Sequence, residues 1–511
     1  LDIFHSTSTQ NTNTPMAGQA PSTVQLACGL MSGTSCDAVD AALVWTDGYD
    51  YIKLGPTSEV PISTSLRNKI RTVQTWADTT HRSSCVATQQ SSSNVFISSQ
   101  AHTQRNVHPD RRHPFAIQIE EELTALHALA VQLAVAQLSQ EELQRTPLRV
   151  VGFHGNTICH FPPSRQMATL NHHSPFTWQL GDGQRLANLL QVPVVFRFRD
   201  NDIAQGKGEG APLAPIYHRA LCTSRMKPRV NPTGSGHPAI EMAVLNIGGV
   251  SNITICTSGH PDRHTTNTML AFDIGPGNAL LDDFMLARTG IPMDNNGAAA
   301  AKGTPNTTFI QRAMTAGPLS AFLTRQGPKS CDRDQFVKSL DQATLSNMST
   351  NDGAATLTML TVQCIRNALS KVPLWTQTWS HPLSSSPQML VVAGGGRKNA
   401  TLMRWLSTEL GSKVHVVTAD AMGWRGDSVE AEAFAYLAVR SVLRLPLSWP
   451  GTTGTVQPVT GGILVHPRKD RTAKDMDDGA GTAGMLPWVV GAGMGGILVV
   501  LLVGFSLWKK R

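Results

Sequence analysis

Charged and aromatic residues are scarce in this chain of 511 residues: Asp, Glu, Lys and Arg make up 15%, and Phe, Trp and Tyr make up 6%. A coiled coil or a disordered, highly charged chain needs far more charge, so both classes are excluded. The net charge is +7, but three of these charges lie beyond His466, and no basic run is interleaved with aromatic residues. We therefore expect no nucleic-acid partner.

Regular cysteine spacing is also absent, because the eight cysteines are scattered without a CxxC pair. A disulfide framework would show even, closely spaced cysteines, so we expect reduced thiols. The first ten residues contain no apolar core of the kind that a secretion signal has. Together these features predict a cytoplasmic catalytic body.

Apolar residues form 41% of the chain, enough for a large core. Short apolar runs at 24–30, 39–45, 148–153, 192–196, 242–247, 389–392 and 413–417 read as strands, and 115–142 reads as an amphipathic helix. Strands that alternate with helices favour an α/β fold. We expect a disordered segment at 1–22, two lobes at 23–243 and 244–467, polar insertions at about 81–113 and 376–387, and a linker at 468–484.

The end of the chain has a different composition. No charged residue occurs from 479 to 508, and a helix over 488–508 would be about 30 Å long, the thickness of a bilayer core. Trp488 and Trp508 suit the two membrane interfaces, and Lys509 to Arg511 follow. The sequence therefore predicts a single transmembrane helix at 485–508 that would tether the body to a membrane, rather than a buried core helix.

Three Gly-rich turns follow apolar strands: 33–35 with Asp37 close behind, 246–252, and 394–399. None is a P-loop, and none is a GxGxxG turn that opens a helix, so P-loop NTPases and Rossmann dehydrogenases are not supported. Such turns let backbone N–H groups approach phosphate oxygens, while a nearby carboxylate can hold Mg²⁺. One turn alone would be unremarkable, but three together predict nucleotide binding.

Asp273 ends an apolar strand just before a Gly-Pro-Gly turn and a helix expected at 279–288. A kinase needs an acid or base close to the transferred phosphoryl group, so Asp273 is the candidate catalytic residue. From the sequence alone, N-capping of the following helix is an equally good interpretation.

Eight segments then carry a specific resemblance: 29–37, 152–157, 177–181, 210–213, 246–252, 272–278, 394–396 and 426–431. In this order they resemble the anhydro-N-acetylmuramic acid kinases, from about residue 25 to 467. The resemblance implies a two-lobed actin/hexokinase-like, ribonuclease-H-type α/β fold. It also implies use of ATP and Mg²⁺ to open a 1,6-anhydro sugar with water and phosphorylate its O6, and it leaves a homodimer open.

The resemblance also assigns residues. Asp273 would be the catalytic base, and Asp37 and Glu430 would hold Mg²⁺. ATP would be bound by Ser32, Gly33, Thr34, Ser35, Asn246, Gly248, Gly249, Gly394, Gly395, Gly396 and Asn399. The sugar would be bound by His154, Gly155, Asn156, Gly275, Pro276, Gly277 and Asn278. On its own, His154 would more often be a structural histidine.

Some positions depart from the family pattern. Arg197 stands where an acid is usual, and Asn156 and Glu209 stand where Gln is usual. Asp332 replaces a glycine. These changes concern the sugar more than the phosphoryl chemistry, so the substrate could be anhydro-N-acetylmuramic acid or a simpler anhydrosugar such as levoglucosan. A second hypothesis is a catalytically weak pseudokinase that acts as a membrane-tethered sugar or nucleotide sensor.

The membrane helix yields a direct test. When the full chain is expressed and its membranes are treated with alkaline carbonate, we expect the protein to stay in the membrane pellet, because a spanning helix is not released by high pH. A deletion of 485–508 is the matched control. Complete release of the full chain would contradict the tether.

Overall fold

A computed structural model of the protein describes residues 23–33, 36–87, 114–164, 175–225, 240–257, 269–331, 336–375 and 389–468. The segment 1–22, the insertion at 376–387, almost all of the linker at 468–484 and the membrane helix expected at 485–508 lie outside these residues. Among the helices that are described, none is long and apolar enough to cross a bilayer. Leu1–Pro467 belong to one compact unit.

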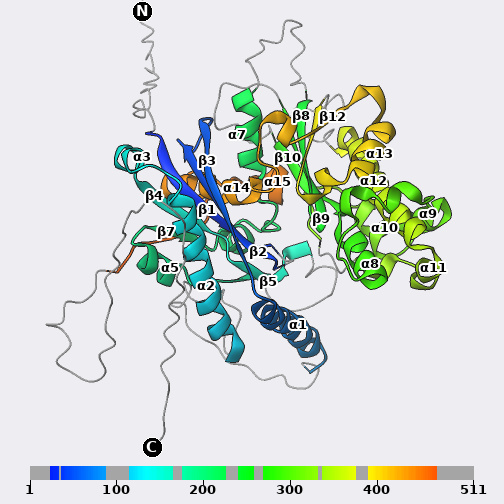
Figure 1. Ribbon diagram of the computed structural model, residues 1–511, viewed down its shortest axis with the longest axis horizontal. Coiled ribbons are helices and arrows are strands. Elements are labelled where there is room, and N and C mark those ends of the chain that lie inside the picture. The colour runs from blue at the N-terminus through cyan, green and yellow to red at the C-terminus, as the bar shows by residue number, and fades with distance from the viewer. Residues whose placement is uncertain are drawn as a thin grey trace, which may run out of the picture. The chain divides into compact units, whose positions relative to one another are not determined.

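Two mixed sheets and a short hairpin make up the strands, which confirms the α/β class (Figure 1). The first sheet has the order β13 (Ile463–Val465), β7 (Val194–Phe196), β4 (Leu148–Phe153), β1 (Gln25–Met31), β2 (Ala38–Thr46) and β3 (Ile52–Pro61). The second has the order β10 (Met269–Pro276), β9 (Val250–Thr257), β8 (Ile240–Ile247), β11 (Met389–Ala393) and β12 (His415–Thr418). The strands β5 (Asn156–Phe161) and β6 (Phe176–Leu180) form the hairpin.

The helices follow the same division along the chain. Those before residue 226 are α1 (Thr64–Ala87), α2 (Pro114–Val135), α3 (Gln140–Arg145), α5 (Gly183–Leu190), α6 (Asp200–Ala204) and α7 (Pro215–Arg225). Those after residue 278 are α8 (Ala279–Thr289), α9 (Thr307–Thr315), α10 (Gly317–Thr324), α11 (Gln342–Asn347), α12 (Thr350–Trp375), α13 (Ala400–Leu410), α14 (Val429–Val442) and α15 (Pro450–Thr453).

Strand β1 shows how the first sheet is buried on both faces. Its residues alternate, so that Leu26, Cys28 and Leu30 join the core beneath α1 and α2, whereas Ala27 points to the core around α14. The strand is parallel to β4 and antiparallel to β2. A central strand of this kind reads as a continuous apolar run, which is why it was predictable.

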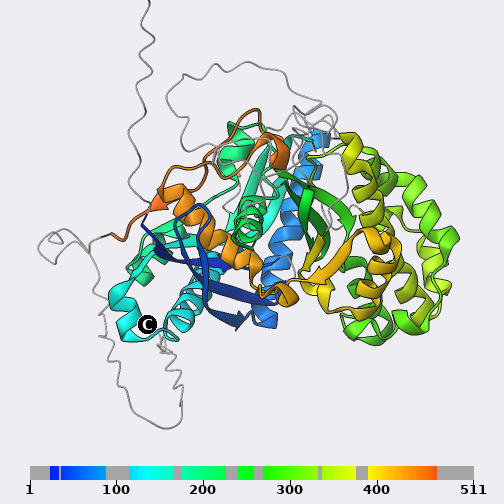
Figure 2. The same cartoon turned by 90° about the horizontal axis from the view of Figure 1, so that it is seen from above.

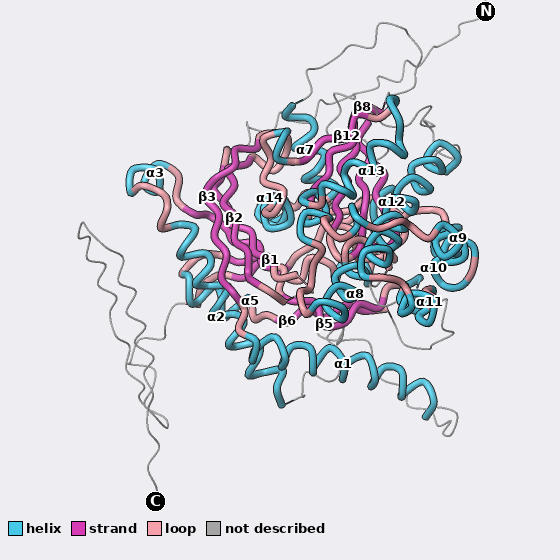
Figure 3. Tube along the Cα trace, turned by 45° about the vertical axis from the view of Figure 1, so that its right-hand side comes forward, coloured by secondary structure: helices cyan, strands magenta, loops and turns pink. Residues whose placement is uncertain are grey.

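A shared core joins the two sheets. It combines Ala27 and Val150 of the first sheet with Val244 and Val391 of the second, around Phe434 of α14. Figure 3 shows α14 between the strands of the two sheets, and Figure 2 shows it (orange) beside the dark blue strands β1 to β3. Although α14 and β13 come last in the compact unit, both pack on the first sheet, β13 by pairing with β7.

Two expectations need correction. The helix expected over 115–142 is two helices, because α2 ends at Val135 and Ser139 starts α3 with a capping box to Glu142. The polar insertion expected at 81–113 begins later, since α1 continues through Ala87 and only 88–113 lie outside the described residues. Polar composition hid a helix end in the second case.

The contact between α14 and the first sheet predicts a stability effect. A side chain at Gly29 would overlap the backbone carbonyl of Ala431, which cannot move without moving the helix. We expect Gly29→Ala to destabilise the fold by about 3 kcal/mol or more. Thermal unfolding measures this. Gly248→Ala is the matched control, because its new methyl group would meet nothing closer than 3.7 Å. Equal melting temperatures for both variants would contradict the packing.

Candidate functional site

Asp273 lies near the end of β10, at an irregularity where the pairing with β9 shifts between Asp273 and Gly275. Its side chain is 8% exposed, and its Oδ2 accepts a hydrogen bond of 2.9 Å from the backbone N–H of Cys331. The Cys331 thiol lies 3.6 Å from the same oxygen. Burial raises the pKa of Asp273 to about 6, and the Cys331 hydrogen bonds and Arg199 limit this rise.

This geometry decides between the two interpretations of Asp273. The N-cap of α8 is Asn278, five residues further on, and its side chain makes no capping bond. Asp273 instead turns toward Cys331 in the segment that follows α10. The carboxylate is therefore not a helix cap.

Arg199 and His154 form a hydrogen-bonded unit beside it. Arg199 donates from Nε to His154 Nε2 (3.0 Å) and from Nη1 to the carbonyl of Gly210 (2.7 Å). A carbonyl only accepts, so the 2.9 Å contact of His154 Nδ1 with Gly155 O puts the proton on Nδ1. Burial, followed by the charge of Arg199, lowers the pKa of His154 well below its usual value. His154 is thus a neutral acceptor that orients Arg199.

The charge of Arg199 is shared by several acids. Burial lowers its pKa, and Glu430, Asp202 and Asp273 oppose that effect in this order. A guanidinium stays protonated in proteins, so Arg199 is a permanent cation between acids of both halves of the chain. The sequence singled out the pair Arg197 and Arg199 only as possible carboxylate ligands. Arg197, by contrast, has a left-handed backbone (φ 57°) and pairs with Asp200.

The loop after β1 is held by Asn156. The side-chain Nδ2 of Asn156 donates to the carbonyls of Gly33 (3.1 Å) and Ser32 (3.4 Å), and Ser32 Oγ donates to Gly155 O (3.3 Å). Asn156, expected at the sugar, therefore braces the predicted phosphate loop. The expected residues Thr34 and Ser35 lie outside the described residues.

The two expected magnesium ligands differ in their surroundings. Asp37 is 67% exposed and pairs with Arg67 at 3.1 Å. Glu430, in the first turn of α14, is exposed to solvent, and its Oε1 accepts from Asn246 Nδ2 at 3.0 Å. Neighbouring protein still desolvates Glu430 and raises its pKa, against the effect of Arg199. That combination is expected of a carboxylate facing an enclosed but wet space.

Asp40, which the sequence did not single out, lies in the same region. Burial and then the charges of Glu59, Glu430 and Asp427 raise its pKa to about 7. The alternation along β2 contained no signal for this, because Asp40 meets those acids only in the folded sheet.

Two of the Gly-rich turns interlock with the segment expected at the sugar. The backbone N–H of Asn278 donates to Gly248 O (2.7 Å), and that of Gly277 donates to Gly249 O (3.0 Å). A side chain at Gly277 would overlap the Gly248 carbonyl, so only glycine permits this approach. Asn278 Nδ2 also donates to Ile247 O at 3.2 Å. Residues 248–249 and 275–278 therefore form one layer.

The third turn joins this layer from β11. Gly394 has a left-handed φ of 73°, and a side chain there would overlap the Asn246 amide oxygen. Asn399 caps α13 by accepting from Leu402 N–H (2.9 Å). Asn246, Gly394 and the layer above thus meet at one edge of the second sheet.

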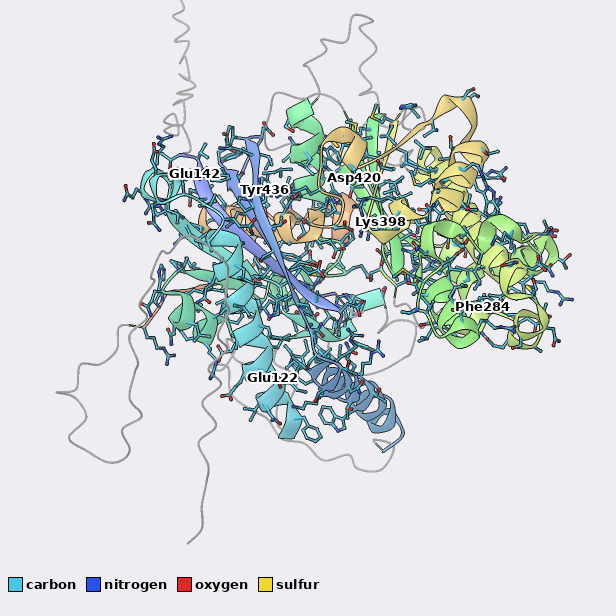
Figure 4. All side chains as sticks on the ribbon, viewed as in Figure 1. Glu122, Glu142, Phe284, Lys398, Asp420 and Tyr436 are labelled. Carbon is cyan, nitrogen blue, oxygen red and sulfur yellow. The ribbon has the colours of Figure 1, made fainter. Side chains whose placement is uncertain are left out.

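Charges fix this turn in place. Arg397, 7% exposed, donates to Asp420 (2.7 Å) and makes two 2.8 Å bonds to Asp427, and Lys398 pairs with Asp427 at 2.9 Å. The hydrogen bonds from Arg397 hold the pKa of Asp427 at about 2. Lys398 and Asp420 are labelled in Figure 4. The Gly394–Gly395–Gly396 motif marked the turn in the sequence, but not this network.

The His154 geometry is testable by NMR. We expect its ring resonances not to titrate between pH 5.5 and 8, because burial and Arg199 both disfavour the imidazolium. His154→Phe assigns the signals and serves as the control. An inflection near pH 6.5 that disappears in this variant would contradict a neutral acceptor.

Comparison with known proteins identifies the family. The family model described as anhydro-N-acetylmuramic acid kinase matches residues 25–113 and 113–467. The enzyme of that name from Rhodopseudomonas palustris is 37% identical over 441 residues, covering 86% of this chain and 99% of its own. The one from Azorhizobium caulinodans is 38% identical over 443 residues, with the same coverage. A ROK hexokinase structure from Thermus thermophilus covers 82% of this chain and 100% of its own, with 12% identity and a TM-score of 0.31. By its sequence, the chain belongs to the anhydro-N-acetylmuramic acid kinase family, and it is a sugar kinase, a phosphotransferase.

Proposed function

We propose that this kinase uses ATP and water to open a 1,6-anhydro sugar and to phosphorylate its O6, with Asp273 as the base. The observation that carries the proposal is the environment of Asp273, a buried carboxylate whose pKa is raised to about 6. Such a group is still ionised at neutral pH but accepts a proton more readily than an ordinary aspartate. Among the described residues, its printed side-chain hydrogen bonds all go to Oδ2, which leaves Oδ1 to take the proton.

The bond changes balance as follows. Asp273 takes one proton from water while the water oxygen bonds to the anomeric carbon, and the bond from that carbon to O6 breaks with its electron pair on O6. O6 then bonds to the γ-phosphorus of ATP as the bond to the ADP oxygen breaks. The products are the opened sugar 6-phosphate, ADP and the proton on Asp273, which passes to solvent. One base thus serves two consecutive bond exchanges.

Arg199 supplies the positive charge for this step. Phosphoryl transfer depends mainly on positioning and on stabilising charge at the transferred group. Arg199 lies among Glu430, Asp202 and Asp273, and His154 and Gly210 O hold its fork in one orientation. We propose that its remaining N–H groups face the oxygens that gain charge.

The chain's residues also fit a divalent cation with ATP. Mg²⁺ in kinases usually takes one or two carboxylates and keeps waters and phosphate oxygens as its other ligands. Glu430 is exposed and keeps Oε2 available beyond its Asn246 bond, whereas Asp37 is already paired with Arg67. We propose Glu430 as the principal ligand, and Asp37 as one that acts through water. When bound, the cation neutralises phosphate charge; Gly248, Gly249 and Gly394 to Gly396 would line the nucleotide.

The sugar is proposed from the relatives. Both bacterial enzymes are named for anhydro-N-acetylmuramic acid, so we propose this substrate first and a levoglucosan-like anhydrosugar second. Gly155, Gly275 and Pro276 remain proposed sugar contacts, next to His154 and Asp273.

The central test is Asp273→Asn. We expect kcat to fall about 10²- to 10⁴-fold, because the amide cannot accept the proton. For the wild type, we expect kcat/KM to fall as the pH drops below about 6, since protonation of Asp273 removes the base. The measurement is ADP release with and without each anhydrosugar over a range of pH.

Asp283→Asn on α8 is the control for this test, because Asp283 is an exposed aspartate on the helix that follows. Equal turnover of wild type and Asp273→Asn would sink the assignment of the base. ATP binding without sugar-dependent turnover in the wild type would instead support the pseudokinase.

A further inference from the structure

We propose that Glu209 is a positioning residue for Asp273, acting through Ser330 and through its own negative charge. The proposal rests on Asp273 being the base of the proposed function. Glu209 lies in the loop between α6 and α7, far in sequence from both partners, and its side chain does not hydrogen-bond Asp273 in any described contact.

Three donors hold the Glu209 carboxylate. Oε2 accepts from Ser330 Oγ at 2.8 Å and from Ser164 Oγ at 2.6 Å, and Oε1 accepts from the backbone N–H of Ser164 at 3.2 Å. Glu209 is 8% exposed. A buried carboxylate with three donors is fully used as an acceptor, a role that a neutral amide fills less well because its NH₂ group cannot accept.

The backbone of Glu209 is fixed as well. Its N–H donates to Thr453 O at 2.7 Å, and its carbonyl is 2.9 Å from His160 Nε2. Both side chain and backbone are therefore tied to neighbours, from β5 and α15. Glu209 is thus a rigid support rather than a mobile surface acid.

Ser330 transmits this support to Asp273 because its two neighbours hold that residue. The carbonyl of Lys329 accepts from Asp273 N–H (2.8 Å), and the N–H of Cys331 donates to Asp273 Oδ2 (2.9 Å). Lys329 anchors the segment by donating from its buried Nζ to Phe322 O (2.8 Å) and Arg325 O (3.0 Å). Residues 329–331 thus clamp the backbone and the side chain of Asp273, and Glu209 holds the middle of the clamp.

Charge gives Glu209 a second effect. The charged and titratable groups that influence Asp273 are Cys331, which lies against it, Arg199, which lowers its pKa, and Glu209, which raises it. Buried Lys329 interacts with Asp273 as well. A negative charge beside a carboxylate disfavours ionisation and so makes it a stronger base. Glu209 and Arg199 therefore act in opposite directions on the same group.

Two substitutions separate the two effects. Glu209→Gln keeps an oxygen for the Ser330 bond but removes the charge, so we expect the acid limb of kcat/KM against pH to move to lower pH while the plateau changes by less than about threefold. Ser330→Ala keeps the charge but breaks the link, so we expect the plateau to fall about tenfold, the loss expected for a hydrogen bond to a charged group, with no shift of the limb to lower pH.

Matched controls keep the test decisive. Ser330→Thr retains the hydroxyl and should restore the plateau. Glu432→Gln removes another buried carboxylate, held by Tyr217 and Arg425, and should leave the acid limb in place. Melting temperatures confirm that each variant is folded. If Asp273→Asn is inactive, yet Glu209→Gln leaves the limb unmoved and Ser330→Ala leaves the plateau unchanged, the role of Glu209 is overturned and the base stands. Full activity of Asp273→Asn would overturn both.

Discussion

The close packing of α14 on the first sheet is the contact on which the rest of the structure depends. Gly29 on β1 and Gly152 on β4 leave room for the helix backbone at Ala431 and Phe434. The helix is buried along most of its length, and Tyr436 reaches back to the carbonyl of Tyr49 (2.8 Å). Because α14 also belongs to the core shared with the second sheet, its position relates the two sheets to each other.

That position has a direct effect on the site. Glu430 lies in the first turn of α14, and its partner Asn246 lies on β8 of the second sheet. Arg199 comes from the first half of the chain and Asp273 from the second, and both respond to each other's charge. In surroundings that exclude much of the water, such charges interact strongly and must be held in place by partners. His154, Gly210, Cys331 and Asn246 provide those partners.

The sequence predicted the features that depend on neighbours along the chain. The apolar run before Ser32, the Gly-rich turns and the strand end at Asp273 were all visible, because each is a local pattern of residue types. The class of fold and the kinase activity followed from eight ordered motifs. These patterns contain the residues that the structure brings to one edge of the second sheet.

The sequence could not predict which polar groups pair across long distances. Asn156 looked like a sugar ligand but braces the loop at Gly33, and Asp37 looked like a metal ligand but pairs with Arg67. Glu209 and Ser330 are 121 residues apart and occupy unremarkable positions in their own segments. Nothing in the spacing of these residues encodes such contacts, because they depend on how the sheets pack.

The late position of α14 also affects how the chain is made. Gly29 and the helix residue that covers it are separated by roughly 400 residues, so the first sheet lacks its second covering layer until almost the whole body has been synthesised. At about 5 to 20 residues per second, this interval lasts about 20 to 80 s. For that time, Ala27, Val44 and Val150 have no helix over them. A nascent chain with such a face is exposed to aggregation, so the ribosome-bound protein is a natural client for chaperones that shield apolar strands.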